Sequence, residues 1–146
     1  MLTGNCLCGA VAFEVEEKLT RVEVCYCSRC QRAYGTGLAA TVYARLDRFR
    51  WVRGVDAVQT YDAPLLQEPP PYRHVFCGKC GSPLPICREE FGFVEIPVGV
   101  LSVQVKEALA YEMFIPRKHP WGARLGSVDC FEGAVPLSKK VLSELR

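Results

Sequence analysis

The chain has 146 residues, of which 49% are hydrophobic, and this length and composition suit one globular domain with a buried core. Its formal net charge is only +2, because 18 Lys and Arg residues are scattered among 16 Asp and Glu residues. This balance argues against a nucleic-acid partner, which requires a basic stripe. No apolar run approaches the roughly 20 residues that span a bilayer, so we expect no membrane partner.

The first residues, Met1 to Asn5, contain no charged leader followed by an apolar run, which favours a cytoplasmic location. The nine cysteines are an odd number, and their density is below that of small disulfide scaffolds. Without a secretory signal, this combination favours metal ligation over disulfides.

Short alternating segments at residues 10–17, 21–25 and 38–43 predict β-strands in the first part of the chain. Between the last two, residues 31–35 resemble a single helical turn closed by Gly35. These elements place the first cysteines at the ends of strands.

The middle of the chain predicts a hairpin and then a loop. Residues 47–53 and 56–61 are expected to pair with each other around a turn at Gly54 and Val55. Residues 63–72 contain four prolines, which remove backbone donors and predict an extended surface loop.

The second half predicts strands at 72–77, 84–88 and 93–98. Residues 99–106 fit strand or helix, because apolar residues alternate there while good helix formers follow at 107–110. Beginning at Pro136, apolar residues recur at helical spacing and predict a short C-terminal helix. We therefore expect a mainly β fold in a single domain over residues 1–146.

Seven of the nine cysteines fall into three clusters: Cys6-x-Cys8, Cys25-x-Cys27-x-x-Cys30 and Cys77-x-x-Cys80. Thiolates at this spacing on a chain reversal can aim their sulfurs at one ion about 2.3 Å away, and a following glycine permits the tight turn. Gly9 and Gly81 stand at that position. The pattern predicts zinc sites.

Because structural zinc takes four ligands, seven thiolates divide naturally as four plus three. Cys6, Cys8, Cys77 and Cys80 would then complete one structural site, and Cys25, Cys27 and Cys30 would hold a second zinc with one position open for a ligand. A second partition, in which Cys77 and Cys80 join two of the central three, fits the same spacing. The isolated Cys87 and Cys130 are more typical of small core residues.

The residues around the clusters resemble the glutathione-dependent formaldehyde-activating enzyme family, whose domain centromere protein V shares. The motifs are GNCLCGAV at 4–11, CYCSRCQR at 25–32 and FCGKCGS at 76–82, with weaker matches at 97–101 and 119–121. The resemblance implies several short coiled antiparallel β-sheets (a β-tent) stapled by zinc. It also implies a structural zinc on the outer pairs and a catalytic zinc on the central three cysteines.

The reaction implied by the resemblance is the reversible addition of glutathione to formaldehyde, giving S-hydroxymethylglutathione. Three thiolates blunt the Lewis acidity of zinc, which disfavours water activation, but an open position can bind and activate a further thiol. We therefore expect a carbon–sulfur lyase acting on a glutathione-like thiol and a small aldehyde. Tyr26, which stands where family members commonly have His, and Tyr34 are candidate proton donors, although packed aromatic roles are the simpler interpretation.

Four further side chains are candidates by residue type: Arg29 and Arg32 for substrate carboxylates, and His74 and His119 for the second zinc. Trp121 fits a ligand cleft or, more simply, a buried core position.

Two other functions fit the sequence. One is a non-catalytic interaction module with one structural zinc and an empty or oxidised central triplet. The other is a redox sensor that forms disulfides among Cys25, Cys27 and Cys30. Short edge strands are compatible with a monomer or a homodimer.

Overall fold

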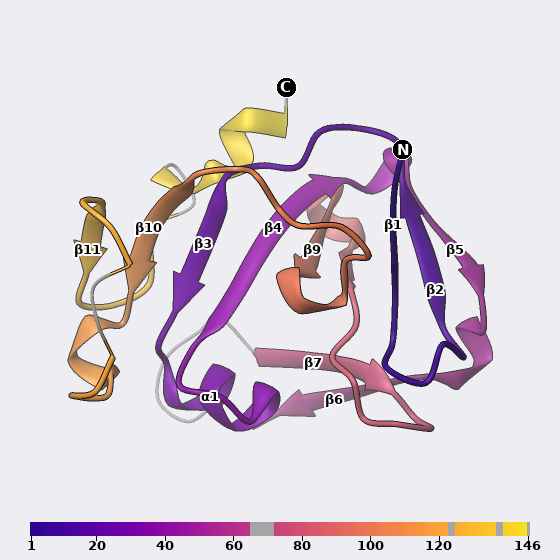
Figure 1. Ribbon diagram of the computed structural model, residues 1–146, viewed down its shortest axis with the longest axis horizontal. Helices are drawn as coiled ribbons and strands as arrows, with labels where there is room; N and C mark the ends of the chain where they lie inside the picture. The colour runs from indigo at the N-terminus through magenta and orange to yellow at the C-terminus, as the bar shows by residue number, and fades with distance from the viewer. Residues whose placement is uncertain (65–71, 123–124, 137–138, 146) are drawn as a thin grey trace.

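A computed structural model of the chain describes residues 1–64, 72–122, 125–136 and 139–145 (Figure 1). These residues form 11 β-strands in three sheets, one α-helix and several short 3-10 turns, which confirms the predicted mainly β fold. Within the same residues, no helix has the length and apolar character needed to cross a bilayer.

The largest sheet has six strands in the order β11-β10-β3-β4-β9-β8. Their bounds are β3 Val22–Cys25, β4 Ala39–Arg45, β8 Ile86–Arg88, β9 Phe93–Pro97, β10 Leu109–Met113 and β11 Asp129–Phe131. The strand β10 runs parallel to both β3 and β11, so the expectation of purely antiparallel sheets is wrong here. Parallel neighbours need a long crossover, and the chain between β3 and β10 supplies one that contributes strands to all three sheets.

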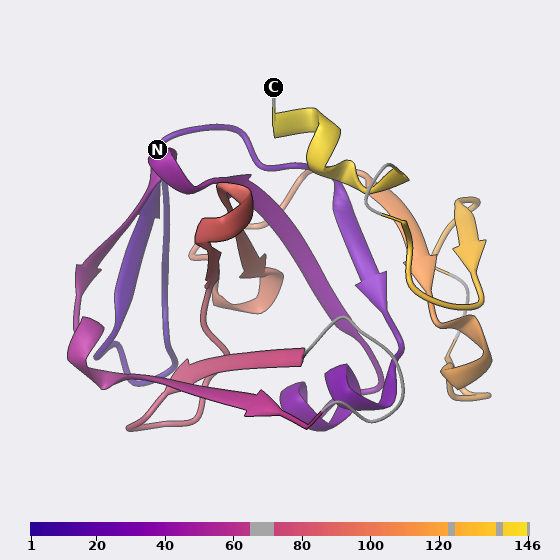
Figure 2. The same ribbon diagram turned by 180° about the vertical axis from the view of Figure 1, so that it is seen from behind.

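A three-stranded sheet pairs β1 (Leu2–Asn5) with β2 (Ala12–Val15) and β2 with β5 (Phe49–Arg53). A two-stranded sheet pairs β6 (Val58–Ala63) with β7 (Tyr72–Cys77). Figures 1 and 2 both show β6 and β7 crossing the ends of the other elements, from the three-stranded sheet to the α-helix. The strand β7 therefore connects two distant parts of the molecule.

The predicted hairpin of residues 47–53 with 56–61 is wrong, because β5 pairs with β2 and β6 pairs with β7. Gly54 has a left-handed φ of 72° and the 3-10 turn Val55–Ala57 follows it, which sends the chain into a different sheet. Gly54 also lies against the segment that precedes β2, where an added Cβ would be 2.0 Å from the carbonyl oxygen of Ala10. Most of the predicted proline loop, residues 65–71, lies outside the described residues.

The α-helix, α1, spans Ser28–Tyr34, so it begins earlier than the predicted turn and ends at Gly35 as expected. The predicted short C-terminal helix is present as a 3-10 helix over Val141–Leu145, and residues 137–138, near its predicted beginning, are not described. The Lys139 amide donates to the Pro136 carbonyl three residues earlier, the bonding of a tight turn. A segment this short cannot sustain an α-helix by itself, and packing of the buried Val141 decides its shape.

The ambiguous residues 99–106 contain no strand: Val98–Val100 form a 3-10 turn and irregular chain follows. The helix formers that come next enter strand β10 instead, because pairing with β3 overrides their weak local preference.

Two clusters of the hydrophobic core include clustered cysteines. One contains Cys25, Cys27 and Met113, and another contains Cys6 and Cys77.

Candidate metal centres

Four cysteines, two near the N-terminus and two from the middle of the chain, meet beside the three-stranded sheet, and we call them the outer group: Cys6, Cys8, Cys77 and Cys80. Their sulfur atoms all lie within 4.8 Å of one another, with 3.5 Å between Cys6 and Cys8 and 3.9 Å between Cys8 and Cys77. A tetrahedral zinc with bonds of about 2.3 Å requires sulfurs about 3.8 Å apart. The outer group therefore fits a closed four-thiolate site.

Two similar turns build the outer group. The Gly9 amide donates to the Cys6 carbonyl at 2.9 Å, and the Gly81 amide donates to the Cys77 carbonyl at 2.8 Å. Both glycines have φ above 70°, a conformation that other residues rarely adopt. The Val11 amide donates to the Cys6 sulfur at 3.3 Å, which stabilises negative charge there.

Ser82 ties the two turns together. Its hydroxyl oxygen accepts from the Leu7 amide at 2.9 Å and lies 3.3 Å from the Cys80 sulfur. Hydrogen bonds from the Ser82 side chain, followed by its backbone amide, lower the pKa of Cys80 to about 6. Cys80 thus favours the thiolate form that a metal binds.

The other three clustered cysteines, Cys25, Cys27 and Cys30, form the central triplet, with all three sulfurs within 4.8 Å. Cys25 ends β3, Cys27 caps the N-terminus of α1, and Cys30 follows in the first turn. Among the described His, Cys, Asp and Glu residues, none adds a fourth ligand atom to this group. The sulfurs are therefore divided four plus three, and Cys77 and Cys80 lie with the outer group rather than with the triplet.

Hydrogen bonds concentrate negative charge on one sulfur of the triplet. The thiols of Cys25 and Cys30, and then the amides of Cys30 and Arg29, hold the pKa of Cys27 far below its usual value. The Cys30 amide lies 3.3 Å from that sulfur. The same interaction with Cys27 raises the pKa of Cys25 to about 12. Three sulfurs, one of which favours the thiolate form, suit a soft divalent metal.

Both groups lie within the part of the chain that matches a known family. The sequence model of the glutathione-dependent formaldehyde-activating enzyme family, GFA, matches residues 1–118. The chain belongs to this family. A crystal structure of a protein from Rhodobacter sphaeroides is similar, with 28% identity and a TM-score of 0.53 over 71% of this chain and 91% of that chain. No curated protein matches the chain.

In this GFA-family protein, Tyr26 does not serve as a free hydroxyl near the triplet. Its side chain is only 2% exposed, and its hydroxyl donates to Glu112 Oε2 at 2.7 Å. Lys118 Nζ donates to the same oxygen at 2.9 Å and lies 4.8 Å from the centre of the Tyr26 ring. Tyr26 is therefore a packed aromatic residue, as the simpler interpretation has it, and its hydroxyl is held by a buried carboxylate that sequence patterns did not reveal.

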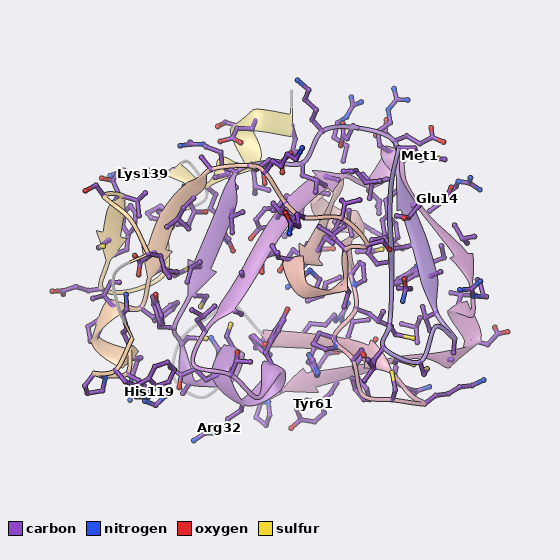
Figure 3. The ribbon with its side chains drawn as sticks, viewed as in Figure 1. Met1, Glu14, Arg32, Tyr61, His119 and Lys139 are labelled. Atoms are coloured by element: carbon purple, nitrogen blue, oxygen red, sulfur yellow. The ribbon has the colours of Figure 1, made fainter. Side chains whose placement is uncertain are left out.

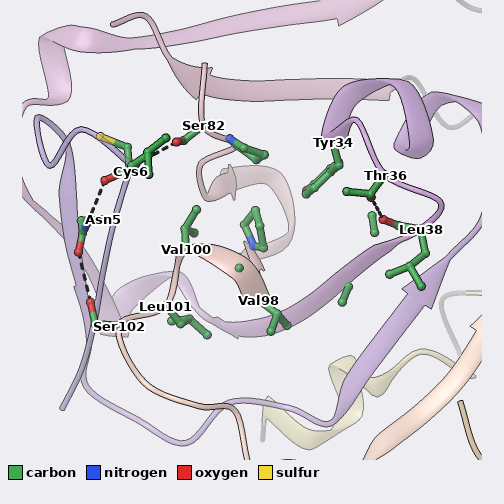
Figure 4. Close-up of a pocket in the computed structure, with 16 residues that line it drawn as sticks. Asn5, Cys6, Tyr34, Thr36, Leu38, Ser82, Val98, Val100, Leu101 and Ser102 are labelled. Atoms are coloured by element: carbon green, nitrogen blue, oxygen red, sulfur yellow. Dashed lines mark hydrogen bonds between the residues drawn. The ribbon is translucent and has the colours of Figure 1, made fainter. Parts of the chain in front are cut away.

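Tyr34, the other candidate donor, lines a cleft of about 750 Å³ between the two cysteine groups. Figure 4 shows its ring extending from α1 into this cleft, opposite Val98 and Val100. Burial, followed by the nearby charge of Cys30, raises the pKa of Tyr34, so its hydroxyl keeps its proton at neutral pH. Tyr34 is thus the candidate donor that faces open space.

The strand β7 links the two cysteine groups through residues at its ends. Tyr72, which was not singled out from the sequence, lies near Cys30, and burial followed by the Cys30 charge raises the pKa of its hydroxyl. Cys77, at the other end, belongs to the outer group. Six extended residues separate the groups by about 17 Å. The one sequence feature that could have indicated Tyr72 as a site residue is its position at the start of a predicted strand.

The remaining candidates lie away from the sulfurs. Arg32 points outward from α1, whereas the guanidinium of Arg29 lies 5.4 Å from the centre of the Tyr72 ring (Figure 3). His74 stacks on Phe76 at 5.2 Å, and burial lowers its pKa. Neither His74 nor His119 joins a ligand group.

Two burial predictions are wrong. Trp121 is 76% exposed and stacks on His119 at 5.4 Å, since it sits on the surface over Gly37 instead of in the core. Cys130 is exposed because β11 is the edge strand of the large sheet. Cys87 is half-buried and packs against a core cluster, in line with its expected core role.

Proposed function

We propose that this protein is a zinc-dependent carbon–sulfur lyase that joins glutathione or a similar thiol to a small aldehyde. The observation that carries the proposal is the central triplet, three sulfurs with no fourth ligand among the described residues, beside a cleft. Membership of the GFA family supports the thiol and aldehyde chemistry. We place both centres in one domain over residues 1–146.

In this proposal the outer group holds a structural zinc and the central triplet holds a catalytic one. The donor chemistry supports zinc, since all seven ligands are thiols and backbone amides donate to the sulfurs of Cys6, Cys25 and Cys27. When bound to the triplet, zinc supplies a position for the substrate thiol and lowers that thiol's pKa from about 8.5.

The bond changes are simple. The substrate thiol gives up its proton and its sulfur attacks the aldehyde carbon, so a carbon–sulfur bond forms while the carbonyl π electrons move to oxygen. The oxygen takes up one proton in return, so the reaction adds S–H across the C=O bond. The product is a hydroxymethyl thioether in the case of formaldehyde, and the reverse reaction breaks the same bond. No oxidant or reductant is needed.

Tyr34 is the proposed hydrogen-bond donor to the oxygen on which charge develops. Two observations support this role: Tyr34 lines the cleft, and its raised pKa keeps the hydroxyl protonated. The apolar walls formed by Val98, Val100 and Leu101 would limit competing water.

Zinc content and exchange kinetics test the proposal together. We expect two zinc ions per chain after metal-replete purification, and faster interconversion of formaldehyde and glutathione in NMR exchange spectra when the protein is present. Cys27→Ser should abolish the acceleration and lose one zinc, whereas the matched variant Cys87→Ser should keep both. A single zinc in the unmodified protein, with no acceleration at stoichiometric protein, would favour the interaction module instead.

A further inference from the structure

Among the described residues that line the cleft, none is Asp, Glu, Lys, Arg or His, and Cys6 of the outer group is the one side chain there that could carry a charge near neutral pH. Its walls are formed largely by aliphatic side chains and prolines: Leu38, Pro83, Pro97, Val98, Val100 and Leu101. Its volume of about 750 Å³ lies within the range of small-molecule sites, about 300–1,000 Å³. The cleft therefore has room for much more than formaldehyde.

Most polar groups of the cleft are already engaged by the protein. The Asn5 side-chain amide donates to the Cys6 carbonyl at 2.8 Å, and the Ser102 hydroxyl donates to Asn5 Oδ1 at 3.3 Å (Figure 4). Ser82 accepts from the Leu7 amide, and the Thr36 hydroxyl donates to the Leu38 carbonyl. These bonds leave the Tyr34 hydroxyl as the principal polar group facing a ligand.

One end of the cleft adjoins the central triplet. Ala39, which lines the cleft, is paired in register with Cys25 across β3 and β4. Tyr34 lines the same end, and it belongs to the helix that carries Cys30. A thiol whose sulfur reaches the triplet therefore extends its substituent along the apolar walls.

Two partly buried lysines near the triplet, Lys118 and Lys140, are not available to a ligand in the cleft. Lys118 is paired with Glu112 at 2.9 Å, and Lys140 lies 3.8 Å from Glu23 and above the Tyr43 ring. Neither lysine is among the residues that line the cleft. A carboxylate moved from water into an apolar site without a partner pays a large desolvation cost.

We infer that the thiol substrate of this protein is a neutral, largely apolar thiol, so that glutathione with its two carboxylates is a poor occupant of the cleft. The inference deepens the proposed function, because it identifies the class of thiol that the reaction joins to the aldehyde. The neutral substituent packs on Val98, Val100 and Leu101, and the hemithioacetal oxygen meets the Tyr34 hydroxyl.

Calorimetric titration of the zinc-loaded protein tests this with a matched pair of probes, benzyl mercaptan and 4-(mercaptomethyl)benzoate, alongside glutathione. We expect the neutral probe to bind at least about tenfold more tightly than either anionic thiol. Thr36→Lys places a cation on the exposed rim of the cleft and should improve binding of the benzoate about tenfold, while Val103→Lys, outside the cleft, should not. Equal or tighter binding of glutathione by the unmodified protein would overturn the inference.

A second arm separates this inference from the proposed function. In the Cys27→Ser variant, 1-hexanol and hexanoate contain no thiol, so their binding does not depend on chemistry at the triplet. NMR titration should show methyl shifts of Val98, Val100 and Leu101 with hexanol and much weaker ones with hexanoate. This preference would support a neutral cleft even if the exchange assay showed no catalysis. Equal binding of the two probes would refute the neutral cleft even if catalysis were found.

Discussion

Replacing Tyr26 with Phe removes one hydroxyl group from the segment that carries the central triplet. The hydroxyl donates to the fully buried Glu112 at 2.7 Å, and Tyr26 itself is 2% exposed. Phe preserves the ring and therefore leaves no large cavity, and the ring keeps its contact with Lys118. The variant thus isolates the loss of one buried hydrogen bond to a charged group.

Hydrogen bonds to charged groups contribute about 1.5–3 kcal/mol to stability. After the change, Glu112 retains the Lys118 ammonium at 2.9 Å and the Leu125 amide at 3.4 Å, so the carboxylate is not left without partners. We therefore expect the lower part of this range, a loss of about 1.5–2 kcal/mol in the free energy of unfolding at pH 7.

The effect should depend on pH with a definite sign. Burial opposes ionisation of Glu112, but the hydrogen bonds from Lys118 and then Tyr26 prevail and lower its pKa below the ordinary value of 4.5. A carboxyl with a lowered pKa contributes stability above the unfolded-state pKa and loses it as the pH falls through the folded-state pKa. The difference between the wild type and Tyr26→Phe should accordingly be full at pH 7 and shrink below about pH 4.

Urea unfolding of the zinc-loaded proteins, with the midpoint and slope compared, measures this difference. Tyr61→Phe is the matched control, because Tyr61 is 56% exposed and its loss should change stability by less than about 0.5 kcal/mol. A change of that small size for Tyr26→Phe would refute the role assigned to the bond with Glu112.

Two further predictions concern the outer group and the chain reversal at Gly54. Cys77→Ser should lose one zinc ion and destabilise the protein by more than about 3 kcal/mol, because structural zinc supplies folding energy. The control Cys87→Ser should retain both ions. Metal analysis and urea unfolding test this prediction, and unchanged stability of Cys77→Ser would contradict it. Gly54→Ala combines a left-handed φ of 72° with a contact of 2.0 Å to a backbone oxygen, while Gly92→Ala has the same φ and nothing within 4 Å. Unfolding midpoints should show a loss of about 1 kcal/mol for Gly92→Ala and more than about 2 kcal/mol for Gly54→Ala, and equal losses would show that the close contact is unimportant.

The sequence could predict those strands whose residues alternate locally, such as β3 and β7. It could not predict β10 or its pairing with β3, because Glu107 to Ala110 favour helix locally and only that pairing makes Leu109 and Ala110 extended. The hairpin was wrong for a related reason: the residues of β5 and β6 are adjacent in sequence, but Gly54 directs them into different sheets. Strand pairing depends on tertiary contacts, which local sequence patterns do not encode.

The sulfur groups were predictable because each cluster is built by a short local turn. Their membership was less certain from spacing, since bringing Cys8 within 3.9 Å of Cys77 requires the whole fold between them. The contact of Tyr26 with Glu112 was hidden for the same reason, because 86 residues separate the two side chains. The exposure of Trp121 could not be inferred from residue type, which reports only an average preference.

The same tertiary contacts explain why no carboxylate of the described residues joins the central triplet. Two acidic side chains lie on the strands beside it, Glu23 on β3 and Glu112 on β10, and both are almost completely buried. Glu23 accepts hydrogen bonds from the hydroxyls of Tyr43 and Tyr111. Glu112 is occupied by Tyr26 and Lys118.

Moving either carboxylate to a metal would leave buried hydroxyls or an ammonium without an acceptor, which costs about 1–3 kcal/mol for each group. The tyrosines therefore keep both acids from acting as a fourth ligand. In the proposed function, the pairing of β3 with β10 would thereby leave one position on the metal to an incoming thiol, which a purely structural metal site does not need.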